Sequence, residues 1–299
     1  MTAGRFLDRR ARPLSEPVRR TVLAVAIVAL SVAMVWAWRR SALRLDDLRW
    51  WPLAALAAVA APLSLVLKAA EFTVASRVVG QRPSRARALE VAMVSSAANL
   101  LPVPGSLLVT VQTIAAEGAG YGGAARASAV PGIAWLGVTG VAGGAAIALV
   151  GPLSVGLASI GAGVVALVAS WLVLRSVTAA SERVALAAAV LVVESAWLAV
   201  SGLRFTLAAA VLGVDLELGQ AIALSVAGAV TAAIGFVPGG LGVREALIAA
   251  LSPVIGLDVE TGVLLGAVDR VVWLGFLALG TAVFGVRRTS GLRGSSDPR

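Results

Sequence analysis

Several ionisable side chains lie inside apolar stretches of this sequence, where an isolated charge is costly to bury. Arg244 and Glu245 follow the run Pro238-Gly239-Gly240-Leu241-Gly242 after one intervening valine, and Asp269-Arg270 lies in a later apolar stretch. A charged side chain at the centre of a bilayer costs roughly 3 kcal/mol on insertion scales, so it should face a partner or a wet cavity. If a helix begins after the glycines, its free N–H groups and the Arg244 guanidinium suit an anionic group such as a phospholipid phosphate. The glycines also have a structural explanation, because small residues allow close helix packing in membranes.

The candidate binding residues lie beside one of two chain breaks or at the expected depth of the membrane. We assign headgroup binding to Asn99, Glu194, Gly239, Gly240, Gly242, Arg244, Glu245 and Arg270. The other charged residues at that depth are candidates for ion pairs or for coupling to an ion: Lys68, Glu71, Arg204 and Asp269. A purely structural role stays open for three of them. Lys68 and Glu71 are three residues apart on one helix face, and Arg204 can extend to the membrane interface.

The composition excludes several kinds of catalytic site. The chain contains neither cysteine nor histidine, so it has no thiol nucleophile, no disulfide framework and no imidazole to act as base or metal ligand. The glycine run is not followed by the Lys-Ser/Thr pair of a nucleotide-binding P-loop. An intramembrane enzyme would have to take its general base from Asp or Glu. We therefore expect no enzymatic activity, no metal and no cofactor.

These candidate residues depend on membrane helices for their positions. Hydrophobic residues make up 59% of the 299-residue chain and charged residues only 14%, whereas about a quarter of the residues in a soluble domain are charged. Lipid accepts apolar side chains all round a helix. Apolar segments occur near residues 21–38, 52–76, 88–116, 127–150, 153–174, 184–212, 219–251 and 261–286. We predict an all-α, polytopic transmembrane helix bundle with six to eight spans.

Two segments carry breaks that a simple spanning helix would not contain. Pro102-Val103-Pro104-Gly105 interrupts the third segment and the glycine run interrupts the seventh, because proline removes a backbone donor and glycine loosens a helix. The arms of the third segment are about 20 and 16 Å long, shorter than a hydrocarbon core of about 30 Å. Each broken segment therefore either crosses as a kinked helix or forms a re-entrant hairpin that leaves on the side where it entered.

The charges of the loops favour the re-entrant alternative. With two hairpins the chain crosses six times, and the basic loops 77–87 and 175–183 lie inside while acidic residues 215–217 and 258–260 lie outside. This distribution follows the positive-inside rule. With two full crossings, the loops 175–183 and 215–217 exchange sides, and the rule is followed less well.

Arginine also accumulates at the two ends of the chain. Residues 1–20 and 287–299 are basic and flank a single transmembrane domain at 21–286. The positive-inside rule places both ends in the cytoplasm, so we predict a multi-pass protein of the cell membrane. We assign the net charge of +9 to membrane orientation and not to nucleic-acid binding.

An internal repeat relates the two broken segments. Glu71-Phe72-Thr73-Val74-Ala75 matches Arg204-Phe205-Thr206-Leu207-Ala208 at an offset of 133 residues, and one inserted residue brings Pro104-Gly105 onto Pro238-Gly239. The two halves are about residues 21–150 and 153–286. In the re-entrant alternative each half has three crossings, so the second half is inverted relative to the first. Inverted repeats with broken helices near the midplane are typical of transporters.

Three motifs resemble the transmembrane region of lysylphosphatidylglycerol synthases and their stand-alone flippase-like relatives. They are Asn99-Leu-Leu-Pro102-Val-Pro104-Gly105, Phe236-Val-Pro238-Gly239-Gly240-Leu241-Gly242-Val-Arg244-Glu245, and Asp269-Arg270 with Gly280 ten residues on. The resemblance covers nearly the whole chain and implies a membrane domain that moves lipid between leaflets. In the full-length relatives a soluble synthase domain follows, whereas only residues 287–299 follow here. We therefore do not expect synthase activity.

These observations favour a lipid transporter or flippase-like protein whose ligand is the headgroup of a phospholipid or aminoacylated lipid. The sequence shows no ATP-binding motif, so we expect downhill movement or coupling to protons or the membrane potential through Glu71, Glu194 or Glu245. The alternative is a non-transporting membrane scaffold or regulatory subunit of a cell-envelope biosynthetic enzyme. Beyond the lipid bilayer itself, a homo-oligomer or an envelope-biosynthesis partner stays open.

Overall fold

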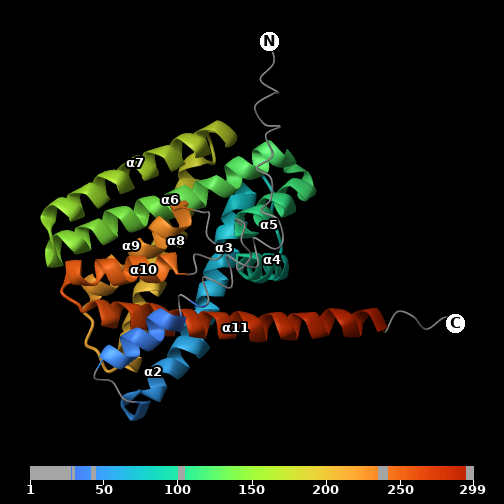
Figure 1. Ribbon diagram of the computed structural model, residues 1–299. Coiled ribbons are helices and arrows are strands. Elements are labelled where there is room, and N and C mark those ends of the chain that lie inside the picture. The colour runs from blue at the N-terminus through green and yellow to red at the C-terminus, as the bar shows by residue number, and fades with distance from the viewer. Residues whose placement is uncertain (1–27, 29–30, 42–44, 100–104, 235–241, 294–299) are drawn as a thin grey trace.

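The computed structural model describes residues 28, 31–41, 45–99, 105–234 and 242–293, and these residues are all-α (Figure 1). Five segments are long and apolar enough to cross a membrane: Trp50–Val78, Gly105–Val150, Leu153–Val177, Arg183–Val211 and Val259–Val283. The predicted all-α class is confirmed, and the five segments support a multi-pass membrane protein. The basic segment 1–20 and the break residues Pro102, Pro104, Pro238, Gly239 and Gly240 lie outside the described residues.

The first half of the chain runs from the helical residues 31–40 to a long helix, α6. Its elements are η2 (Leu45–Asp47), α2 (Trp50–Ala55), η3 (Leu56–Ala60), α3 (Ala61–Val78), α4 (Arg85–Ala98), α5 (Gly105–Ile114), η4 (Ala115–Ala119) and α6 (Gly120–Val150). The Ser84 hydroxyl accepts a hydrogen bond from the Arg87 N–H at 3.2 Å and caps the start of α4. Gly118, with a φ of 107°, separates α5 from α6 in a conformation that favours glycine.

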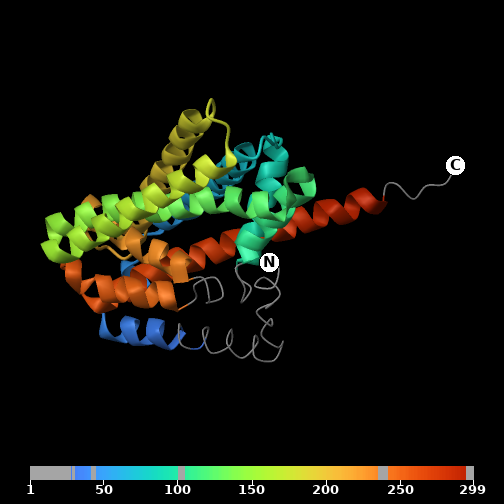
Figure 2. The same ribbon diagram turned by 90° about the horizontal axis from the view of Figure 1, so that it is seen from above.

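The second half begins directly after α6. Its elements are α7 (Leu153–Val177), α8 (Arg183–Val211), α9 (Leu218–Ile234), α10 (Val243–Leu251), η6 (Pro253–Ile255) and α11 (Val259–Arg293). At 35 residues, α11 is about 52 Å long at 1.5 Å per residue. Both ribbon views show its C-terminal part projecting beyond the other helices (Figure 2).

Each broken segment of the sequence forms two short helices that pack against each other. This holds for α4 with α5 and for α9 with α10. The side chain of Gln81, before α4, donates a hydrogen bond to the backbone oxygen of Ile114, at the end of α5, at 2.9 Å. Gln220, at the start of α9, donates in the same way to Ile255, just after α10, also at 2.9 Å. The outer ends of the two helices, which we call the feet of the pair, therefore lie together. The chain doubles back within each broken segment.

Among the described helices, α6 and α7 make the most extensive contact and lie side by side (Figure 1). Glycines allow this close approach. A methyl group built on Gly140 would lie 2.8 Å from the Cα of Gly163, and one on Gly163 would lie 2.8 Å from the oxygen of Gly137. Small residues at such crossings are typical of helix pairs in membranes, where packing and not water exclusion holds helices together.

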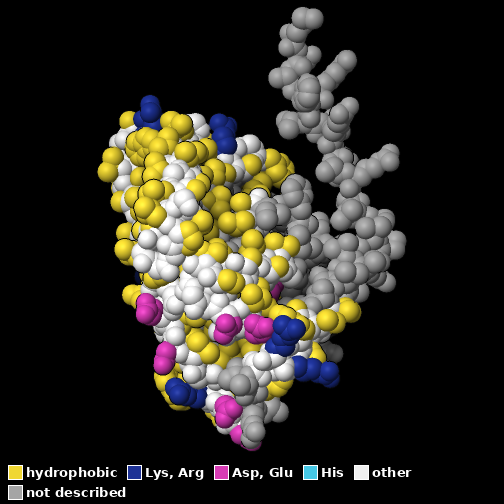
Figure 3. Space-filling view, turned by 60° about the vertical axis from the view of Figure 1, so that its left-hand side comes forward, with side chains coloured by type: hydrophobic (Ala, Val, Ile, Leu, Met, Phe, Trp, Pro, Cys, Tyr) yellow, Lys and Arg dark blue, Asp and Glu magenta, His cyan; other side chains and the backbone are white. Residues whose placement is uncertain are grey.

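The surface is apolar along the helices and charged near their ends. Figure 3 shows hydrophobic side chains over most of one face, Lys and Arg at both its upper and lower ends, and Asp and Glu towards the lower end. Two hydrogen bonds join neighbouring loops. The Thr178 hydroxyl donates to the Val78 oxygen, and the Arg49 N–H donates to the Val211 oxygen at 3.0 Å. The basic loops 77–87 and 175–183 thus meet at one end of the helices.

Candidate ion-pair site in the membrane domain

Asp269 is the centre of a buried group of charges contributed by three helices. Its two carboxylate oxygens accept hydrogen bonds from Arg204 Nε of α8 at 2.6 Å and from Arg244 Nη1 of α10 at 2.8 Å. Asp269 itself, on α11, is 1% exposed. A carboxylate buried this deeply is stable only when paired, and here two guanidinium groups supply the opposite charge. The three residues fix the positions of α8, α10 and α11 relative to one another.

A second pair lies beside the first on the same two helices, α10 and α11. Arg270 Nε donates to Glu245 Oε1 at 3.1 Å, and the other oxygen of Glu245 accepts the backbone N–H of Gly242 at 2.8 Å. Glu245 therefore caps the start of α10 and holds Arg270 at the same time. Gly242 has a φ of 81°, which a residue with a Cβ rarely adopts.

We call these five residues the arginine cluster: Arg204, Arg244, Glu245, Asp269 and Arg270. Three cations and two anions leave the arginine cluster with a net charge of +1. The surplus positive charge is most accessible at Arg244, because its side chain is 19% exposed, compared with 9% for Arg204 and 7% for Arg270. An anion that entered the site would therefore meet Arg244 first.

Aromatic rings and one hydroxyl complete the surroundings of the arginine cluster. The guanidinium carbon of Arg204 lies 5.1 Å from the centre of the Trp273 ring, and that of Arg244 lies 5.5 Å from the Phe205 ring. Both distances suit a cation–π contact. Arg204 Nη1 also donates to the Ser64 hydroxyl of α3 at 3.2 Å. The Ser64 contact attaches the arginine cluster to the first half of the molecule.

Glu194 belongs to a different charged group. On α3, Lys68 Nζ lies 2.9 and 2.8 Å from the two carboxylate oxygens of Glu71. Glu194 of α8 interacts electrostatically with both of these residues and is 1% exposed. We call Lys68, Glu71 and Glu194 the Glu194 group.

The structure thus divides the residues singled out from the sequence. Gly242 and the members of the arginine cluster come together at the start of α10. Glu194 lies with Lys68 and Glu71 instead. Asn99 ends α4 with an exposed side chain, and Gly239 and Gly240 fall outside the described residues.

Sequence reasoning missed three contacts of the arginine cluster: Ser64, Phe205 and Trp273. Trp273 is four residues after Asp269 and Phe205 directly follows Arg204. Helical spacing therefore offered a signal for Trp273 only, since residues four apart share a helix face. Ser64 lies 140 residues from Arg204, so only the crossing of α3 with α8 brings the two together.

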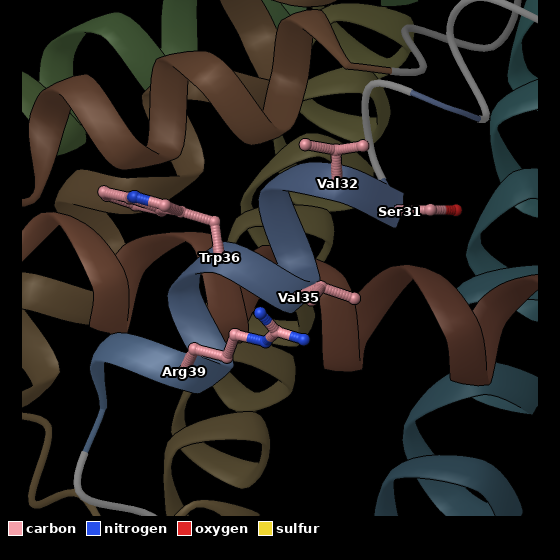
Figure 4. Close-up of a pocket in the computed structure, with 5 residues that line it drawn as sticks. All are labelled: Ser31, Val32, Val35, Trp36 and Arg39. Carbon is pink, nitrogen blue, oxygen red and sulfur yellow. The ribbon is translucent and has the colours of Figure 1, made fainter.

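Two hollows among the described residues lie away from the arginine cluster. A shallow apolar groove of about 400 Å³ follows the helical residues 31–40 and is lined by Ser31, Val32, Val35, Trp36 and Arg39 (Figure 4). A smaller cavity of about 140 Å³ lies between α6, α7 and α8, with side chains such as Leu167, Trp171 and Val190. Both linings are chiefly apolar and suit hydrocarbon better than a charged group.

Among the described residues there is no group of three or more Asp or Glu side chains that could hold a metal ion. Comparison of the chain with protein-family profiles, with curated proteins and with solved structures gives no match. The resemblance of the two Pro-Gly motifs to the flippase-like family stays a prediction.

Proposed function

We propose that this protein is a lipid transporter that moves a phospholipid or aminoacylated lipid between the leaflets of the cell membrane. The observation that carries the proposal is the arginine cluster, which holds a net positive charge among membrane helices and leaves Arg244 partly exposed. A structural ion-pair network would be expected to balance its charges. A surplus guanidinium beside a helix start suits a phosphate or other anionic headgroup.

The position of Arg244 strengthens this interpretation. It is the second residue of α10, two positions after Gly242, where backbone N–H groups at the start of a helix carry partial positive charge. Glu245 satisfies only the Gly242 N–H. A lipid phosphate would then receive hydrogen bonds from the helix start and from Arg244, while its acyl chains stay in the bilayer.

The paired short helices support a six-crossing topology with two re-entrant hairpins. The two glutamine contacts join the feet of each hairpin, and α5 and α10, with 10 and 9 residues, are about 15 and 14 Å long. Neither length spans a core of about 30 Å. The five apolar spans together with the segment 21–38 would give six crossings, with both ends of the chain in the cytoplasm.

Contacts between α3 and α8 support the inverted repeat. The offset of 133 residues relates Glu71 to Arg204 and Ala61 to Glu194. Glu71 and Glu194 interact electrostatically, and exchange of the two halves relates this pair to Arg204 and Ala61. The observed partner of Arg204 is Ser64, one helical turn from Ala61. Such an exchange is expected if α3 and α8 cross antiparallel near a two-fold axis in the membrane plane.

Lipid exchange in vesicles tests the proposal. The purified chain is reconstituted into vesicles that carry a labelled phospholipid, and a membrane-impermeant quencher reports how fast the inner-leaflet label reaches the outer leaflet. We expect faster exchange than in empty vesicles, and slower exchange of the label when unlabelled anionic lipid competes. Equal rates with and without protein, for anionic, zwitterionic and aminoacylated lipids alike, would overturn the proposal.

A further inference from the structure

Glu194 is a carboxyl group near the middle of the span Arg183–Val211, and the arginine cluster makes no use of it. It is 1% exposed, and its Oε1 atom has no hydrogen-bond partner among the described residues. An ionised carboxylate in an apolar interior needs a partner for each oxygen, because the loss of water is not otherwise offset. The carboxyl group of Glu194 is therefore poorly matched to a permanent negative charge.

The nearest cation does not supply the missing partner. Lys68 directs its ammonium group at both oxygens of Glu71, so these two residues neutralise each other. The Glu194 group then carries a net charge of −1 whenever Glu194 is ionised. One bound proton would make the whole group neutral, which is the state that a low-dielectric interior favours.

No other charged residue is placed to balance Glu194. Among the helices packed against α8, the described parts of α2, η3 and α9 contain no ionisable side chain, and Arg126 of α6 and Arg175 of α7 are exposed. On α11, Asp269 and Arg270 are engaged in the arginine cluster, which also holds Arg204 of α8. None of these described cations pairs directly with Glu194, so a cation from solution is the simplest neutralising partner.

A proton fits this site better than a metal ion. Hard cations require several oxygen ligands, whereas the described residues here offer two carboxyl groups, one of them already bound to Lys68. The Lys68 ammonium would also repel a metal ion. A proton needs only one oxygen of Glu194, and Oε1 has no partner among the described residues.

We propose that Glu194 is an exchangeable proton site that couples proton movement to lipid transport. The coupling rests on the function proposed above, whereas the proton site itself does not. The carboxylate takes one proton from water when its surroundings open to one side of the membrane. It remains a neutral carboxylic acid while enclosed between α3 and α8, and it releases the same proton on the other side. Because α3 and α8 correspond in the two halves, their crossing is the place where a rocking motion would change access to Glu194.

Infrared spectroscopy tests the proton site without any transport measurement. The full chain in lipid nanodiscs is titrated with acid and base, and the carbonyl stretch of a protonated carboxyl group is followed. We expect one component of this band, at the frequency of a carboxylic acid in an apolar setting, to appear and disappear reversibly in the wild-type chain and to be absent from Glu194→Gln, whereas the exposed carboxyl groups give the same signal in both chains. The matched control is Glu182→Gln, which removes an exposed glutamate just before α8 and should retain the band. A wild-type spectrum identical to that of Glu194→Gln, or a band that never titrates in the folded protein, would overturn the proposal.

A second variant tests the net charge of the Glu194 group. Lys68→Met removes the partner of Glu71, so two carboxyl groups without a cation would remain and the protonated-carboxyl band should about double. An unchanged band would contradict the assignment of one negative charge to the Glu194 group.

Transport under a pH gradient tests the coupling. We expect an imposed gradient to change the rate of lipid exchange several-fold in the wild-type chain and to leave Glu194→Gln unaffected. If the rate of lipid exchange by the wild-type chain does not change with the pH gradient, the coupling is overturned even if the infrared band titrates. If wild-type vesicles exchange no lipid at all, the proposed function and with it the coupling fail, while the titrating band would still support the proton site.

Discussion

At the scale of single residues, Asp269 is the link on which the arginine cluster depends. It is the shared acceptor of Arg204 and Arg244, and both distances are short enough for charge-assisted hydrogen bonds. Removing its charge would leave three guanidinium groups facing only Glu245. Arg244 differs from the other two because it is the most exposed, so it combines a structural contact with access for a ligand.

Asp269→Asn should therefore destabilise the protein strongly. Breaking a buried ion pair by removing one partner costs about 3–5 kcal/mol, because the remaining charge is buried without compensation. Thermal unfolding in detergent measures the effect. Glu260→Gln is the matched control on the same helix, because its contact with Arg40 is 3.7 Å long and partly exposed, and we expect a change below about 0.5 kcal/mol. Equal unfolding temperatures for the two variants would show that Asp269 is not the link.

The residues of the arginine cluster could be predicted from the sequence, but their pairing could not. A charge inside an apolar stretch is visible in the sequence, and this is why Arg244, Asp269 and Arg270 stood out. The partner of Arg204 lies 65 residues away on another helix. That contact depends on how α8 and α11 cross, which local periodicity does not determine.

At the scale of elements, the molecule is characterised by short helices that double back. Gln81 and Gln220 each donate to a backbone oxygen whose own residue lies at or just beyond a helix end. The last carbonyl groups of a helix lack partners within it, so an amide side chain can satisfy them. A hydrogen bond from a glutamine side chain to a backbone oxygen thus closes each of the two hairpins.

Gln81→Leu and Gln220→Leu should loosen the feet of the hairpins. Losing one such hydrogen bond costs about 1 kcal/mol, so we expect faster hydrogen exchange at the end of α5 or α10 and little change elsewhere. Hydrogen-exchange mass spectrometry measures this. Gln112→Leu removes an exposed glutamine from α5 and serves as the control. If Gln112→Leu speeds hydrogen exchange at the end of α5 as much as Gln81→Leu does, the hydrogen bond of Gln81 does not hold the hairpin closed.

The contact between α6 and α7 predicts another contrast. A side chain at Gly163 would collide with α6, whereas one at Gly161, two residues earlier on α7, meets no atom within 4 Å. Gly163→Leu should lower stability by about 1–3 kcal/mol through overpacking, and Gly161→Leu should not. Thermal unfolding in detergent distinguishes the two. Equal stability would mean that the helices do not approach as closely as Gly140 and Gly163 indicate.

At the scale of the whole molecule, the proposed orientation places the two basic loops on one side of the membrane. Residues of the basic loops 77–87 and 175–183 meet through Thr178 and Val78, and the Gln220 contact holds the two feet of the second hairpin together. The sequence predicted the two breaks but left open whether the chain crosses or returns there. The answer depends on long-range contacts of two glutamines that periodicity does not mark.

Single cysteines test this orientation, and the natural chain contains none that would interfere. Asp215→Cys lies just before the second hairpin in the sequence and Asp258→Cys just after it. Ala180→Cys lies in a basic loop, and all three positions are exposed. We expect an impermeant maleimide to label the first two in intact cells and the third only after permeabilisation. Labelling of Asp215→Cys and Asp258→Cys from opposite sides would contradict the re-entrant hairpin.

The central claim is that Arg244 recognises the headgroup of a lipid that this protein transports. The most direct test is the rate of leaflet exchange of a labelled anionic phospholipid in vesicles that contain the wild-type chain or Arg244→Ala, with Arg126→Ala as an exposed-arginine control. We predict wild-type exchange well above that of empty vesicles, an unchanged rate for Arg126→Ala, and a loss of about tenfold or more for Arg244→Ala, which corresponds to about 1.4 kcal/mol. The three proteins should have similar far-UV circular dichroism. Exchange by folded Arg244→Ala as fast as by the wild-type chain would contradict the claim.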